Sequence, residues 1–240
     1  MKDKVSDHTI NGRIRVLKTF FKFLVSDGLW DGKPNPLEKI SFIKTDKKIK
    51  PVLSIEQVEQ LLRVPNKKTF TGFRNLCIIH LFWDSLIRLG ELINIRVEDI
   101  DFKNGALKIY GGKSRRERIL PLGARVIKNL HRYWTKDREK IDGQYFFCQK
   151  NGRPLTRRDV QRILERIGKK VEIHVSPHLL RHSAATYLAL SGIPAFMLQS
   201  LLGHTTLNTT QMYIHLVDDE RLKKVFMRYS PGDALFTGRR

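Results

Sequence analysis

The nine residues from Asn75 to Trp83, NLCIIHLFW, do most to limit what this chain can fold into. Apolar side chains would lie on almost every side of the helix that this run forms. Such a helix must be covered by other elements, so the run predicts a globular domain built around a central buried helix. It is far shorter than the roughly 20 residues that a membrane-spanning helix needs.

Further helices are predicted on both sides of this run. Ser54 and Gln57 have the spacing of a capping box at the start of a helix. Ser176 followed by Pro177 is typical of another helix start, and Gly203 of a helix end. One more helix is marked by its apolar residues Val160, Ile163, Leu164 and Ile167.

Residues 106–122, ALKIYGGKSRRERILPL, have a different pattern. Two short β-prone runs flank a Gly-Gly pair and a basic turn, which predicts an antiparallel hairpin with a cationic tip. The predicted fold class is therefore mainly α with a small antiparallel β-sheet (α+β).

The front of the chain is predicted to form a separate, smaller unit. Ile10, Ile14, Leu17, Phe21 and Leu24 recur at spacings of four, three, four and three, which predicts an amphipathic helix. We expect the neighbouring aromatic cluster Phe20, Phe21 and Phe23 to be core and not a base-stacking platform. The charged run KTDKKIKP then predicts a linker. The expected domains are 1–48 and 49–230, with 218–240 as a C-terminal helix and tail.

The charge of the chain points to a polyanionic partner. Lys and Arg total 45 against 24 Asp and Glu, a net charge of +21 with a sequence pI near 10.2. Nucleic acid phosphates are the commonest partner of so basic a chain, because binding releases condensed counterions. A membrane surface is the alternative, but the basic residues are dispersed and form no amphipathic stripe.

The two cysteines and the first residues bear on where the chain works. Cys77 and Cys148 lie in apolar surroundings without the spacing of a metal site or a disulfide framework, so we expect reduced core thiols and no metal. The start, MKDKVSDH, has no signal-like apolar core. These features predict a cytoplasmic protein, associated with the nucleoid if DNA is the partner.

Two segments could carry chemistry. His178 and Arg181 are three positions apart in the first turns of a helix, where free N–H groups and the helix dipole favour an anion. His204 follows the helix-ending Gly203, and Tyr213 comes nine positions later, in a helix expected to start near Asn208. Each could instead be structural: a capping or ion-pair residue, a corner histidine, or a half-buried tyrosine.

Four segments in order resemble the signature motifs of the tyrosine recombinases, the Xer and phage-integrase group. They are LIRLGEL (86–92), GGKSRRERILPL (111–122), HLLRHSAATYLALSG (178–192) and LLGHTTLNTTQMY (201–213). The resemblance covers residues 50–230 and implies the recombinase catalytic domain, preceded by a shortened, SAM-like helical core-binding domain. It implies the catalytic residues Arg88, Lys113, His178, Arg181, His204 and Tyr213. It also implies DNA-backbone or hairpin-shaping roles for Arg115, Arg116 and Arg118.

The chemistry that the resemblance implies accounts for these residue types. Arg88 and Arg181 would hold the non-bridging oxygens of a phosphodiester, while Tyr213 attacks the phosphorus and becomes linked to the 3′ phosphate. His178 would take the proton of the phenol and Lys113 would protonate the leaving 5′ oxygen. His204 would donate a hydrogen bond to the phosphoryl group, and no metal or other cofactor is needed.

Structural alternatives remain for three of these residues. Arg88 could form a surface ion pair with Glu91, Lys113 could be a solvated turn lysine, and His204 could bond the backbone.

Two departures from the family pattern stand out. Leu86 replaces a glycine usual two positions before the first arginine, so we expect looser packing there. The front of the chain matches only the last part of a core-binding domain.

The resemblance also implies partners: double-stranded DNA, three further copies forming a homotetramer on two sites, with the tail docking on a neighbouring protomer, and in some cases a partner recombinase. Competing functions are a type IB topoisomerase, an inactive DNA-binding remnant of a mobile element, and a generic basic nucleic-acid binder.

Overall fold

The computed structural model describes residues 5–30, 35–45, 51–110 and 117–203. The chain divides into two compact units, residues 1–50 and 51–240. This division falls within the charged run that predicted a linker. That the first unit is a partial core-binding domain stays a prediction.

The described part of the first unit consists of one helix, α1 (Asp7–Ser26), and a returning segment, 35–45. Ser6 caps the helix, since its side chain accepts a hydrogen bond from the backbone N–H of Thr9. Asn11 holds the returning segment through two hydrogen bonds of 2.8 Å with the backbone of Ile43. Phe21 packs edge-on against Trp30, with ring centroids 5.0 Å apart.

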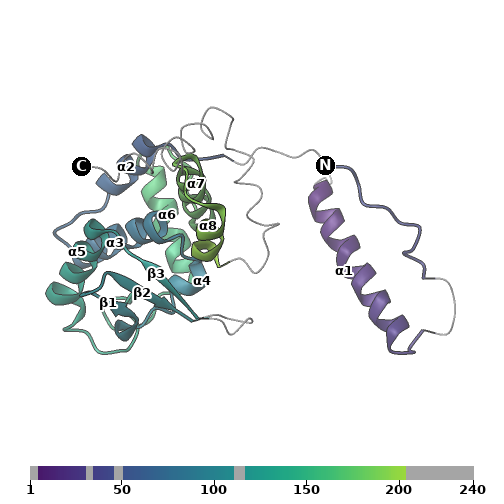
Figure 1. The fold of residues 1–240 in the computed structure, drawn as a ribbon, viewed down its shortest axis with the longest axis horizontal. Helices are drawn as coiled ribbons and strands as arrows, with labels where there is room; N and C mark the ends of the chain where they lie inside the picture. Colours follow the sequence, from purple (N-terminus) through teal and green to yellow (C-terminus); the bar gives the residue numbers. More distant parts are fainter. Residues whose placement is uncertain (1–4, 31–34, 46–50, 111–116, 204–240) are drawn as a thin grey trace, which may run out of the picture. The chain divides into compact units, whose positions relative to one another are not determined.

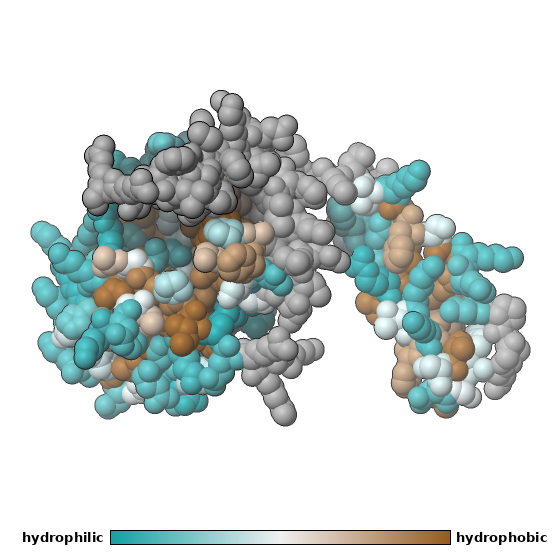
Figure 2. All heavy atoms as spheres, in the orientation of Figure 1, coloured by the Kyte–Doolittle hydropathy of each residue, from teal (hydrophilic) through white to brown (hydrophobic). Residues whose placement is uncertain are grey.

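The prediction that the Phe20, Phe21 and Phe23 cluster is core is wrong for this unit. Phe20 is 53% exposed and Phe23 51%, and no residue of α1 is buried. Within the described residues, the segment 35–45 offers too little surface to cover both sides of such an apolar helix. Apolar side chains consequently lie open to solvent along this unit (Figure 2).

The second unit is mainly helical with one small sheet (Figure 1). In the part of this unit that the structure describes, the α-helices are α2 (Ile55–Arg63), α3 (Phe70–Ser85), α4 (Leu89–Leu92), α5 (Ala124–Tyr133), α6 (Arg157–Lys169), α7 (Pro177–Leu190) and α8 (Ala195–Leu202). Short helical turns cover Val97–Asp99 and Trp134–Arg138. Among the described residues, no helix is long and apolar enough to cross a membrane.

Helix α3 is the centre of this unit, as the apolar run at 75–83 predicted. It packs against α2, α5 and α7 (Figure 1), and eleven of its sixteen residues are buried. Cys77 is among them, and Cys148 is buried nearby in the chain's core, so both predicted core thiols are free and buried. Burial raises the pKa of the Cys77 thiol.

The sheet has three antiparallel strands in the order β1 (Ile100–Asp101), β2 (Ala106–Ile109) and β3 (Arg118–Pro121). The predicted hairpin is β2–β3, in which Leu107 pairs with Leu120 and Ile109 with Arg118. Both leucines are fully buried, and this fixes the register because a slip by one residue would turn them to solvent. The two-residue strand β1 was not predicted.

Helix α3 ends at Leu86, which adopts a left-handed conformation with φ of +53°. Such a conformation costs a leucine roughly 1–2 kcal/mol. The side chain is fully buried in a small second core with Ala184, Ala185, Leu198 and Leu202. Ile87 is fully buried as well, so the expectation of looser packing before Arg88 is wrong. Burial of the side chain offsets the strained backbone and keeps the turn in place.

Substitutions at Leu86 test this balance. Leu86→Ala and Leu86→Gly should each lower the free energy of unfolding by about 2–5 kcal/mol, because both leave a cavity. Glycine relieves the left-handed strain, so Leu86→Gly should be at least as stable as Leu86→Ala in urea unfolding. At Leu81, buried within helix α3, glycine should instead be less stable than alanine by about 1 kcal/mol. If the glycine variant were less stable than the alanine variant at both positions, the backbone at Leu86 would not be strained.

Candidate active site

Arg181 is the buried member of the predicted pair on α7. Ser176 caps this helix by accepting a hydrogen bond from the backbone N–H of Leu179, which places Arg181 in the second turn. Its side chain is buried, and the residue is only 7% exposed. Its guanidinium donates hydrogen bonds to the carbonyl of Leu86 and, at 2.6 Å, to that of Leu202. These carbonyls lie two positions before Arg88 and His204, so Arg181 ties together the segments that lead to both.

Arg88 lies where α4 begins, immediately after the left-handed turn. Its Nη1 donates to Glu91 Oε1 at 3.0 Å and its Nη2 to the carbonyl of Gly203 at 2.9 Å. The backbone N–H of Arg88 also donates to Glu91 Oε2 at 2.8 Å. The side chain is 42% exposed, in contrast to that of Arg181. Arg88 is thus held through both its backbone and its guanidinium, while its side chain stays partly exposed.

Glu91 is shared with a second arginine. Arg118, the first residue of β3, donates both Nη atoms to the two carboxylate oxygens of Glu91, at 2.9 and 2.8 Å. Burial of the Glu91 carboxyl would by itself raise its pKa, but hydrogen bonds from Arg118 and Arg88 outweigh burial and hold the pKa below its usual range. The predicted ion pair between Arg88 and Glu91 therefore exists as part of a larger cluster. Both the functional and the structural interpretation of Arg88 fit this geometry.

The remaining predicted residues divide between described and undescribed parts of the chain. His178 lies at the start of α7, three positions before Arg181, and is exposed. Outside the described residues lie Lys113, Arg115, Arg116, His204 and Tyr213, with the helix expected near Asn208. The structure therefore brings together Arg88, Arg181 and the backbone next to His204.

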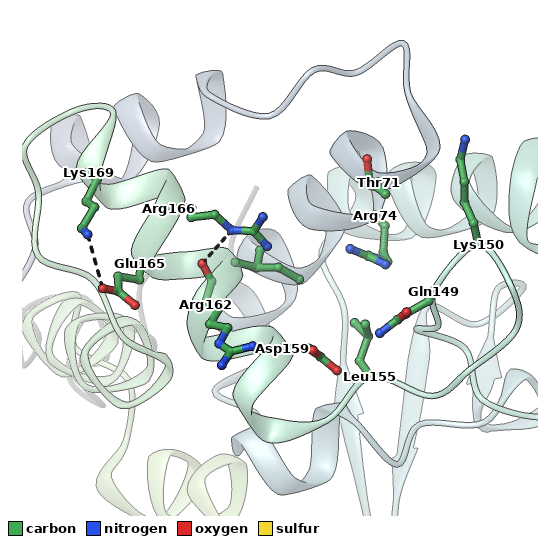
Figure 3. A pocket seen from close by; sticks show the side chains of 11 residues that line it. Thr71, Arg74, Gln149, Lys150, Leu155, Asp159, Arg162, Glu165, Arg166 and Lys169 are labelled. Carbon is green, nitrogen blue, oxygen red and sulfur yellow. Dashed lines mark hydrogen bonds and ion pairs between the residues drawn. The ribbon is translucent and has the colours of Figure 1, made fainter.

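A basic groove lies between α3 and α6 (Figure 3). It encloses about 660 Å³ and is lined by Arg74, Arg162, Arg166 and Lys169, among others. Of the predicted catalytic residues that the structure describes, Arg88, His178 and Arg181, none lines it. In the described ranges, no group of three or more His, Cys, Asp or Glu side chains could hold a metal ion.

Comparisons with known proteins place this geometry in a family. A sequence model described as the phage integrase family matches residues 51–220. The chain belongs to the phage integrase family. Among its relatives is tyrosine recombinase XerC of Thermodesulfovibrio yellowstonii, which is 32% identical over 235 residues, covering 94% of this chain and 77% of that protein. Another is XerC of Syntrophus aciditrophicus, 36% identical over 239 residues, covering 95% of this chain and 76% of that protein.

This phage integrase family member is a site-specific tyrosine recombinase, as the sequence motifs predicted. A solved structure of the Tn1549 transposon integrase, in complex with transposon right end DNA, has the same fold with a TM-score of 0.78. The two sequences are 22% identical, and the match covers 95% of this chain and 81% of the other. The prediction of a recombinase catalytic domain with a small antiparallel sheet is confirmed.

Sequence reasoning did not find that Arg118 pairs with Glu91. It grouped Arg118 with Arg115 and Arg116 because all three belong to one basic run. The position of Arg118 within a strand was the available signal, since alternate strand residues turn toward the protein. A DNA contact by Arg118 stays a prediction; in the structure its guanidinium contacts Glu91.

The lowered pKa of Glu91 leads to a pH-dependent prediction. A carboxylate whose pKa falls on folding stabilises the protein above its ordinary pKa, and this stability is lost as the pH falls through the lowered value. Glu91→Gln should therefore reduce the free energy of unfolding by about 1–3 kcal/mol at pH 7. The difference from wild type should shrink below about pH 4.

Urea unfolding at a series of pH values measures this, with Glu59→Gln as the control. Glu59 pairs with Arg63 on the surface of α2, with side chains 57% and 77% exposed, so its loss should cost less than about 1 kcal/mol. A Glu91→Gln difference that stays constant from pH 7 to pH 3 would contradict the charged role of Glu91.

Proposed function

We propose that this recombinase cleaves and rejoins DNA through a 3′-phosphotyrosyl link to Tyr213. One observation carries the proposal most strongly: Arg181 and Arg88 are bonded to Leu202 and Gly203, the two residues before His204. Two of the six residues implied by the family motifs, Arg88 and Arg181, thus contact the same stretch of backbone at the end of α8. Arg181 and Leu86, which are 95 residues apart in the chain, meet there, as do Arg88 and Gly203, which are 115 residues apart.

The two arginines are suited to bind a phosphodiester. Arg88 uses two of the five N–H donors of its guanidinium on described partners, which leaves three for a phosphate. Charge on the two non-bridging oxygens increases in the transition state, so donors already fixed in place stabilise it more than the ground state. The Arg181 guanidinium is held by the carbonyls of Leu86 and Leu202. It cannot turn away from the proposed phosphate site without losing these buried hydrogen bonds.

The remaining steps are proton transfers. A tyrosine with an ordinary pKa near 10 must lose its proton as it attacks, and we assign this proton to His178, exposed at the start of α7. Lys113, in the β2–β3 connection, protonates the departing 5′ oxygen. His204 donates a hydrogen bond to the phosphoryl group. Because the phosphotyrosyl bond keeps the energy of the broken phosphodiester, rejoining needs no added energy source.

Double-stranded DNA is the partner that the net charge of +21 and the DNA-bound Tn1549 integrase support. Arg115 and Arg116 provide backbone contacts in this proposal, which raise affinity without reading sequence. The same partner leads us to propose a cytoplasmic location at the nucleoid.

Substitution of the nucleophile tests the chemistry. The substrate is a nicked suicide duplex that contains the sequence selected by the purified protein from a random pool. Wild type in EDTA should give a covalent protein–DNA band on a denaturing gel, and Tyr213→Phe should give none while its DNA affinity stays within about twofold. Tyr187→Phe, at a partly exposed tyrosine of α7, is the matched control and should retain the band. A band that persists in Tyr213→Phe would contradict the assignment.

We further propose that four subunits act on two DNA sites through the C-terminal tail. The sequence DDERLKKVFMRY after Val217 has the apolar spacing of an amphipathic helix, with Leu222, Val225 and Phe226 on one side.

A chain that ends at Val217 keeps every proposed catalytic residue. It should cleave the suicide duplex at the wild-type rate but recombine two sites at least tenfold more slowly. Equal loss of both activities, or loss of neither, would contradict the proposed role of the tail. Relaxation of supercoiled plasmid without any recombination by the full chain would favour the topoisomerase alternative.

A further inference from the structure

The Arg118 guanidinium lies where three segments that carry proposed catalytic residues meet. Its two Nη atoms contact the two oxygens of Glu91, whose Oε1 also accepts from Arg88 Nη1. The side chains of Arg118 and Glu91 are only 14% and 15% exposed. Such a paired, charge-assisted contact fixes both the position and the plane of the carboxylate.

The second segment is the end of α8. Gly203 has a φ of +59°, and a Cβ atom on it would lie 2.8 Å from Arg118 Nη1, so any other residue here would require the guanidinium to shift. The guanidinium therefore packs directly against Gly203. The carbonyl of that same residue accepts the hydrogen bond from Arg88 Nη2, and His204 follows it.

The third segment is the hairpin. Arg118 pairs with Ile109 and closes the described part of the β2–β3 ladder. Lys113 lies five positions earlier, in the connection between these strands. The Arg118–Glu91 contact thus holds the turn-proximal end of the β2–β3 ladder against α4.

The surroundings of Arg118 differ from those expected of a phosphate contact. Lys108 and Glu117, at the same end of the hairpin, form an ion pair 2.9 Å long with side chains 44% and 52% exposed. Arg118 is far less exposed, and both of its Nη atoms already donate to Glu91. A guanidinium placed in this way supplies little to DNA affinity.

From these contacts we propose that Arg118 is a positioning residue for cleavage, acting through Glu91 on Arg88. Because Arg118 occupies both oxygens of Glu91, Arg88 keeps one Nη on this carboxylate and the other on Gly203. Without Arg118, the Arg88 guanidinium no longer shares the Glu91 carboxylate with a second cation, and the carboxylate draws that guanidinium away from the phosphate. The inference rests on the proposed function, since it assigns Arg88 to phosphate binding.

Arg118→Gln and Arg118→Lys test the proposal, with Lys108→Gln as the matched control at the same end of the ladder. On the suicide duplex, at saturating protein, Arg118→Gln should cleave at least tenfold more slowly than wild type. Arg118→Lys keeps the charge but not the paired hydrogen bonds, so it should also cleave more slowly. Lys108→Gln should stay within about twofold of wild type, because its pair is exposed. The lysine variant provides the measurement if the glutamine variant does not fold.

DNA binding separates positioning from phosphate contact. In gel-shift titrations over a range of salt concentrations, the Arg118 variants should bind as wild type does, with the same slope of log affinity against log salt. A slope that is less steep by about 0.9 in the Arg118 variants would mean that Arg118 neutralises a phosphate, which overturns the proposal.

A substrate with a methylphosphonate at the scissile position separates positioning of Arg88 from a general defect. This group lacks the negative charge that Arg88 is proposed to bind. The ratio of the wild-type cleavage rate to that of each Arg118 variant should therefore fall toward one on this substrate. A rate ratio as large as on the ordinary phosphodiester overturns the proposal, since Arg118 would then act on the fold or the hairpin. Wild-type cleavage with unimpaired Arg118 variants overturns this inference alone, whereas no wild-type cleavage overturns the proposed function as well.

Discussion

The buried guanidinium of Arg181 is the interaction on which the rest of this site depends. It bonds the carbonyls of Leu86 and Leu202, which belong to segments far apart in the chain. A buried guanidinium without such acceptors would cost several kcal/mol, so the fold can keep Arg181 in place only while both segments remain there. One side chain thereby places the start of α4 and the end of α8 next to α7.

The left-handed turn at Leu86 is the complement of this interaction. It ends α3 abruptly, directs the Leu86 carbonyl to Arg181, and puts Arg88 at the N-cap of α4 two residues later. The turn is strained for a leucine, and the small core that Leu86 shares with α7 and α8 holds it. Glu91 then fixes Arg88 from the other side, and Arg118 fixes Glu91. The candidate site is therefore a chain of contacts in which each arginine is held by a group that another element positions.

Much of this arrangement could be predicted from local sequence signals. The capping box at Ser54, the proline after Ser176 and the Gly-Gly hairpin each reflect short-range rules, and all three elements formed as expected. The left-handed Leu86 could not be predicted, because only tertiary burial makes that conformation acceptable. The Arg118–Glu91 contact spans 27 residues and depends on how β3 meets α4. The exposure of Phe20 and Phe23 could not be predicted either, because periodicity identifies an apolar face but not what covers it.

The central claim, that Tyr213 attacks the phosphate and becomes linked to its 3′ side, is tested most directly by locating the DNA on the protein. The covalent complex with the suicide duplex is digested with trypsin, and the nucleotide-linked peptide is sequenced by mass spectrometry. We predict the peptide from His182 to Arg221, which contains both Tyr187 and Tyr213, with the nucleotide on Tyr213 through a 3′ phosphate and a free 5′ hydroxyl on the other strand end. A nucleotide on Tyr187 or on any other residue, or a link through a 5′ phosphate, would contradict the account.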